Sequence, residues 1–183
     1  VDEEAGKRAE EECKEVMEMI AEIYRNADKG IASNVVLSDE TMCQMKEVIK
    51  ETGQPVTSSE TYATMENYEK MEEFLYACMD GKKGSAVIYE VNYDGGIGRM
   101  EYFFDGTDMY VLAARAVWNQ KNQPGVTYLS YTRINQWEYT EKGWFGYGLC
   151  VPEYPEVTEV VDGSCLIRVR PMTEEQRVMS EKC

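Results

Sequence analysis

Histidine is absent from the 183-residue chain, which removes the commonest general base and the commonest transition-metal ligand. A Ser-His-Asp or Cys-His catalytic centre therefore cannot be built. Glu90, Glu101 and Glu138 each lie in an expected strand, and two such carboxyl groups can hydrolyse a glycosidic bond. Their spacing selects no pair, and solvated strand positions explain them more simply. We expect no catalytic residue.

Two further motifs resemble ligand sites but are explained by turns. Residues 95–98 are rich in glycine, yet they join two expected strands, whereas a phosphate-binding loop opens a helix. Asp94, Asp105 and Asp108 can offer oxygens to calcium, but the spacing of a calcium-binding loop is absent and turn chemistry accounts for them. We therefore expect no cofactor and no metal site.

The six cysteines contain no CxxC pair, which disfavours a zinc or thioredoxin-like motif. Cys13, Cys43 and Cys78 fall on or beside apolar helix faces and are expected to pack as small hydrophobic residues. Cys150 and Cys165 lie on successive expected strands. In a hairpin centred near residue 157 they would face each other, so they are either bridged or free core thiols.

Aromatic residues are concentrated in the second half of the chain, where twelve fall between residues 102 and 147 with arginines among them. Both faces of the expected strands carry them, so they cannot all lie in a core between helices and sheet. Exposed tyrosine and tryptophan are typical of surfaces that bind proteins or sugars, although aromatics also pack well across strands. The candidate ligand-binding residues are Arg133, Trp137, Tyr139 and Trp144.

The net charge of −15 argues against a nucleic-acid partner, because phosphate binding requires a basic surface. The charge is uneven: residues 1–82 carry −11 and residues 83–183 carry −4. A solvated helix surface explains the acidic half most simply. A basic partner or a loosely held cation is the alternative.

The first part of the chain is expected to be helical. Apolar residues recur at a spacing of three to four over residues 3–28, 39–52 and 60–80. Ser38 is a good N-cap for the second helix, and Ser58 or Ser59 for the third.

From residue 85 the pattern alternates with period two, which predicts strands at about 85–93, 97–104, 108–118, 126–139, 144–151 and 164–170. Asp-Gly turns between them indicate antiparallel hairpins. The fold class is therefore α+β, with N-terminal helices packed on a curved antiparallel meander of about six strands, in a cystatin-like or nuclear-transport-factor-like layout. We expect one sheet face to contact the helices and the other to be wetter.

One domain is expected over residues 1–183: a helical part at 1–82, a sheet at 83–171 and a tail or chain end at 172–183. The chain begins at Val1 without methionine, and its charged first twelve residues fit a sequence trimmed after a signal peptide or lipid-anchor segment. Removal of a purification tag would look the same.

The stretches 94–115, 137–144 and 166–171 resemble a family of uncharacterised exported lipoproteins from gut Clostridia. The resemblance implies an extracellular protein on the cell surface, which touches the membrane only through a removed lipid anchor. It also implies that the natural protein continues past Cys183. It assigns no activity and no functional residue.

The leading hypothesis is a non-catalytic cell-surface binding module for an unknown protein or glycan. It predicts that substituting Trp137 or Trp144 weakens binding without unfolding the domain, whereas loss of the fold would mark them as core residues. The first alternative is a carboxylate-based glycan or cell-wall hydrolase. The second is a structural domain that positions a C-terminal partner domain. The sequence does not indicate the oligomeric state.

Overall fold

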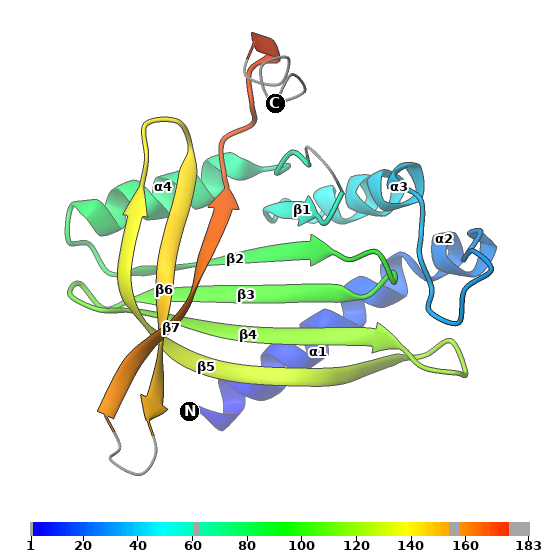
Figure 1. Ribbon diagram of the computed structural model, residues 1–183, viewed down its shortest axis with the longest axis horizontal. Coiled ribbons are helices and arrows are strands. Elements are labelled where there is room, and N and C mark those ends of the chain that lie inside the picture. The colour runs from blue at the N-terminus through cyan, green and yellow to red at the C-terminus, as the bar shows by residue number, and fades with distance from the viewer. Residues whose placement is uncertain (1, 61–62, 154–157, 176–183) are drawn as a thin grey trace.

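A computed structural model describes residues 2–60, 63–153 and 158–175, and the side chains within these ranges except those of 151–164. In these residues helices come first, a short strand precedes the last of them, and a meander of strands follows (Figure 1). The elements are α1 (Glu3–Met19), α2 (Ala21–Asn26), α3 (Asp39–Lys50), β1 (Val56–Ser58), α4 (Tyr68–Met79), β2 (Gly84–Val91), β3 (Ile97–Phe104), β4 (Met109–Trp118), β5 (Pro124–Tyr139), β6 (Trp144–Glu153) and β7 (Thr158–Arg168).

The expected α+β class, with helices packed on a curved sheet, is confirmed. In the described part of the chain, seven strands lie in sequence order, and every neighbouring pair is antiparallel except β1 and β2, which are parallel. The strand beyond the expected six is the three-residue β1. The chain at residues 95–98 forms the expected β2–β3 hairpin, closed by the Asn92 N–H donating to the Gly96 carbonyl at 2.9 Å.

The first helix is shorter than the periodicity predicted. At Ile20 the backbone leaves the helical region, with φ −103° and ψ 6°, and the chain resumes as the short helix α2. No proline or glycine marks this break. It accompanies the burial of Ile20 and the stacking of Tyr24 on Trp118, whose ring centroids lie 4.6 Å apart. Tertiary packing therefore overrides the local helical pattern.

The third expected helix also begins later than predicted. Val56 pairs with Tyr89 in the parallel strand contact, so Ser58, one of the two expected N-caps, lies in strand β1. The helix expected from about residue 60 begins only at Tyr68. Asn67 then adopts a left-handed backbone with φ 55° before α4. Its side-chain amide donates to the carbonyls of Lys50 and Gln54 at 2.9 and 3.0 Å, which fixes the entry to the helix.

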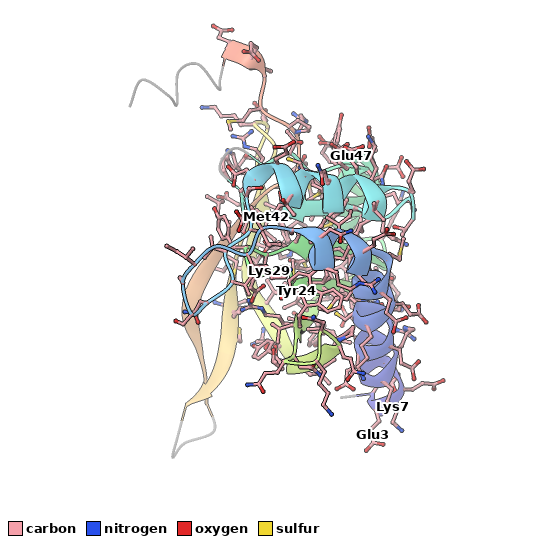
Figure 2. All side chains as sticks on the ribbon, turned by 90° about the vertical axis from the view of Figure 1, so that its right-hand side faces the viewer. Glu3, Lys7, Tyr24, Lys29, Met42 and Glu47 are labelled. Carbon is pink, nitrogen blue, oxygen red and sulfur yellow. The ribbon has the colours of Figure 1, made fainter. Side chains whose placement is uncertain are left out.

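Both faces of the sheet carry helices, which corrects the expectation of one wet face. Helices α1, α2 and α3 pack with one face, around a core that includes Met17, Met45 and Leu112. Helix α4 packs on the opposite face, with Tyr102 and Phe145. In Figure 1 β6 and β7 cross in front of the other strands while α1 runs behind them, and Figure 2 shows the same two layers from the side.

None of the helices in the described ranges has both the length and the apolar composition that crossing a membrane requires. Charged side chains of the acidic half, such as Glu3, Lys7 and Glu47, point into solvent (Figure 2).

Candidate functional site

A groove of about 550 Å³ lies between the first turns of α1 and the strands β3, β4 and β5. It is on the sheet face that α1 covers. Its lining combines aromatic rings with charged groups, and includes Asp2, Arg8, Phe103, Asp105, Tyr110 and Tyr131.

Strand register gathers three aromatic rings in this groove. Phe103 pairs with Tyr110, while Tyr131 pairs with Leu112, two residues further along β4. Side chains two apart on a strand share a face, so all three rings lie on the α1 side. The Tyr110 and Tyr131 rings stack with centroids 5.6 Å apart and planes 8° apart. Because Tyr131 is 42% exposed, this stack presents an aromatic surface to solvent.

The two phenol groups of the stack are available as hydrogen-bond donors. Neither the Tyr110 nor the Tyr131 hydroxyl bonds to another residue within the described ranges. Partial burial, followed by the nearby Tyr110 and Asp105, raises the pKa of Tyr131 above its ordinary value. The phenol therefore keeps its proton at neutral pH and can donate it to a ligand oxygen.

Two carboxylates border the groove, and each is held by one oxygen. Asp2 is the N-cap of α1, and its Oδ1 accepts the Glu4 N–H at 3.1 Å. Asp105 Oδ1 accepts the N–H groups of Thr107 and Asp108, both at 2.8 Å, and these bonds lower the pKa of Asp105. In the described part of the chain no group bonds to the second oxygen of either carboxylate. These oxygens can accept ligand hydroxyl or amine protons.

Arg8 contributes a guanidinium to the groove, and Glu101 of β3 holds it in place. Its Nη2 lies 3.5 Å from Glu101 Oε1, and its side chain is 48% exposed. Glu101 Oε2 in turn accepts from buried Arg99 at 2.9 Å. Arg99 also donates to Glu12 Oε2 through Nη2 at 2.6 Å and through Nε at 2.9 Å. This network ties α1 to β3 and holds the charged side of the groove in place.

The groove is equipped for binding more clearly than for catalysis. Flat aromatic surface, phenol donors, carboxylate acceptors and a guanidinium suit a ligand with apolar faces and polar edges. Asp105 remains ionised because its pKa is lowered, so it is poorly suited to act as a general acid.

The four predicted ligand-binding residues do not converge. Trp137 and Tyr139 face the α4 side of the sheet, where they pack with Phe145. Tyr139 is buried, and its hydroxyl donates to Glu72, which also binds Arg170 Nη2 at 2.8 Å. Burial and the Glu72 hydrogen bond raise the pKa of Tyr139. This packing joins α4 to β5 and to the segment after β7.

The other two predicted residues have different surroundings. Arg133 pairs with Tyr110 across β4 and β5, so it adjoins the aromatic groove. Trp144 begins β6, and the guanidinium carbon of Arg168 lies 4.1 Å from its ring centroid. A ligand role for the four residues stays a prediction, with Arg133 placed best for it.

The three acids singled out earlier do not form a pair either. Glu101 is held by Arg99 and Arg8, Glu138 is exposed, and Glu90 lies half-buried on the α4 side of the sheet. The described residues contain no group of three or more histidine, cysteine, aspartate or glutamate side chains arranged to hold a metal ion.

Cys150 and Cys165 are free thiols. Cys165 lies opposite Tyr147, while Cys150 lies opposite residue 161, because the register shifts between Gly148 and Leu149. The open question of a bridge is thus answered by strand register. Burial raises the pKa values of Cys13 and Cys78 to about 11, so these thiols stay protonated as packing groups.

Sequence reasoning missed the groove although part of its signal was present. The Asp105-Gly106 turn places Phe103 opposite Tyr110, and both belong to the aromatic run. Asp2 and Arg8 gave no such signal, because their place in the groove depends on how α1 crosses the sheet.

Comparison with known proteins gives a family without an assigned activity. A family model described as a family of unknown function (DUF6070) matches residues 6–183. No curated protein and no solved structure matches the chain.

Proposed function

Because the chain belongs to DUF6070, a family of unknown function, we propose its role from the groove: a non-catalytic binding module for a glycan. The observation that carries the proposal is the partly exposed Tyr110–Tyr131 stack flanked by two carboxylates, each with an oxygen to which no described residue bonds. The C–H face of a pyranose ring is apolar and fits an aromatic plane. Its hydroxyl edge fits carboxylate acceptors and phenol donors.

An extracellular, lipid-anchored location belongs to this proposal, because a module that binds cell-surface or dietary glycans must meet them outside the cell. The glycan hydrolase has less support, because it needs one carboxyl kept protonated as general acid, and the lowered pKa of Asp105 suits that group only to the ionised role. A structural role beside a C-terminal partner domain is a third proposal, and it predicts no glycan binding.

Isothermal titration with hexasaccharides of glucose, xylose and N-acetylglucosamine tests the proposal. We expect at least one to bind, and Tyr131→Ala to weaken that binding about tenfold or more, as loss of an aromatic contact does. Tyr93→Ala is the matched control, because Tyr93 is equally exposed at 42% and lies outside the groove.

Unfolding curves of both variants should match the unmodified protein, since each removes a partly exposed ring. The proposal fails if none of the hexasaccharides binds, or if Tyr93→Ala and Tyr131→Ala weaken binding equally.

A further inference from the structure

The groove between α1 and the sheet has an excess of negative charge. Arg8 is the one cation among its described lining residues, and Asp2 and Asp105 are the anions. Arg8 belongs to the network of two arginines and two glutamates that ties α1 to β3, so its charge is already balanced there. The charges of the two aspartates are therefore left for a ligand to neutralise.

Lys83 lies beside the turn that carries Asp105, but it does not take the place of a ligand cation. Its Cγ lies 3.6 Å from the position that a Cβ on Gly106 would occupy, and it is not among the described residues that line the groove. The backbone N–H groups at Asp105 lower the pKa of that carboxyl more than the charge of Lys83 does. No ion pair joins the two side chains within the described ranges.

The Asp105 carboxylate lies near the aromatic stack. Its charge adds to the rise in the pKa of Tyr131, after burial and Tyr110. Two N–H groups of its own turn hold Oδ1, and no described group bonds to Oδ2. A ligand that lies on Tyr131 thus meets a free carboxylate oxygen at its edge.

Asp2 brings a second carboxylate to the groove from a different element. The start of α1 and the β3–β4 turn lie toward the same end of the sheet (Figure 1). Asp2 Oδ1 accepts the Glu4 N–H at 3.1 Å, whereas no described group bonds to Oδ2. Two separate elements therefore each offer the groove a carboxylate oxygen that can bind a cation.

A glucosamine unit has the shape and the charge for this arrangement. When the C–H face of its pyranose ring lies on an aromatic plane, its equatorial substituents point outward toward the border of the groove. The substituent at C2 is an equatorial ammonium group, which forms charge-assisted hydrogen bonds to carboxylates. An ammonium group close to a tyrosine ring also gains a cation–π contribution. N-acetylation removes this charge.

We infer that the groove prefers β-1,4-linked oligosaccharides of glucosamine with free amino groups over their N-acetylated counterparts. This preference rests on the proposed binding of glycans and adds the chemical class of the glycan. The sugar that lies on Tyr131 places its ammonium group at Asp105. Successive amino groups of a β-1,4-linked chain point to opposite sides, so the same chain can offer a second ammonium group to Asp2.

Isothermal titration of the hexasaccharides of glucosamine and N-acetylglucosamine, at about 0.15 M salt, tests the preference. We expect the free-amine chain to bind about tenfold more tightly or better. Asp105→Asn keeps an oxygen for the turn but removes the charge, and it should abolish most of this difference. Asp28→Asn is the matched control, because Asp28 Oδ1 also accepts a backbone N–H, that of Gly30 at 2.9 Å, in an exposed turn outside the groove.

Hexalysine is the probe for charge without a sugar ring, because a protein of net charge −15 attracts polycations in general. We expect Tyr131→Ala to weaken binding of the glucosamine chain about tenfold or more and to leave that of hexalysine unchanged. Thermal unfolding checks the fold of each variant. Asp2→Asn, which keeps a good N-cap, serves if Asp105→Asn does not fold.

Three results would each overturn the preference for free amino groups. The first is equal affinity for the two hexasaccharides, the second is equal weakening by Asp105→Asn and Asp28→Asn, and the third is an equal response of hexalysine and the glucosamine chain to Tyr131→Ala. If neither hexasaccharide binds, the proposed glycan-binding function itself is refuted, and the preference with it.

Discussion

Arg99 is 1% exposed, yet it is charged and lies between α1 and β3. Burial acts to lower its pKa, but hydrogen bonding to Glu101 and the charges of Glu101 and Glu12 outweigh burial and raise it. Arg99 thus stays ionised and neutralises two carboxylates where water is scarce. It also sets the position of Glu101, which holds Arg8 at the groove.

Arg99→Met should therefore destabilise the protein strongly, because it leaves Glu101 buried with only the longer contact to Arg8. Breaking such a pair from one side costs about 3–5 kcal/mol, and we expect the lower end. Urea unfolding measures the loss. Lys50→Met, at a surface pair whose atoms lie 3.4 Å apart, should cost much less stability, because water and salt screen an exposed ion pair. Equal losses of unfolding free energy in the two variants would show that the buried Arg99 network stabilises the protein no more than a surface ion pair.

Among the turns, the one between β5 and β6 does more than reverse the chain. Gly143 has φ +84°, and its carbonyl accepts the N–H groups of Val169 and Arg170 at 2.9 and 3.3 Å. The turn therefore docks on the segment that follows β7. A Cβ at Gly143 would crowd the Arg170 backbone, whose N and Cα lie 3.2 Å away.

Gly143→Ala should cost more stability than an alanine at another glycine of the same backbone conformation. Gly81 is the matched control, because its φ is +73° and nothing lies within 4 Å of an added Cβ. Gly81→Ala carries only the conformational strain, about 1 kcal/mol, while Gly143→Ala adds the collision, for about 2–3 kcal/mol in all. Thermal unfolding distinguishes them, and a smaller shift for Gly143→Ala would mean that the β5–β6 turn moves freely from its neighbour.

At the scale of the whole protein, the central strands β3 and β4 contribute side chains to two hydrophobic cores, one on each face of the sheet. The first contains Ile97 and Leu112 under α1, and the second contains Tyr102 and Val111 on the side of α4. Both strands also have a hydrogen-bonded neighbour on each edge. Opening either strand exposes both cores at once.

Amide hydrogen exchange should accordingly be slowest in β3 and β4, where local opening approaches the cost of global unfolding. The three-residue strand β1 lies at a sheet edge, and we expect it to exchange much faster. Exchange in β1 as slow as in β3 would contradict this order of stability.

Local signals in the sequence located much of the fold. Ser38 was identified as an N-cap, and its Oγ accepts the Thr41 N–H at 3.1 Å at the start of α3. The Asp-Gly turns at residues 94–96 and 105–106 join β2 to β3 and β3 to β4 as expected. Caps and tight turns depend on a few adjacent residues, so a pattern of residue types is enough to place them.

Signals of this kind are missing wherever distant segments meet. The parallel pairing of Val56 with Tyr89 places Ser58, an expected N-cap, in strand β1. Nothing near Val56 in the sequence indicates a partner more than thirty residues away. The register shift in β6 likewise separates Cys165 from Cys150. The irregular register between Ile134 and Trp137 places Arg133 on the opposite sheet face from Trp137 and Tyr139.

The sequence by itself therefore determined the acidic character and the high aromatic content, which follow from composition. It also determined the fold class, which follows from periodicity and short turns. The tertiary structure decided which aromatics meet in the groove, and how Arg8, Asp2 and Asp105 come to border it. These relations depend on strand register and on the crossing of α1 over the sheet, which packing between distant residues sets.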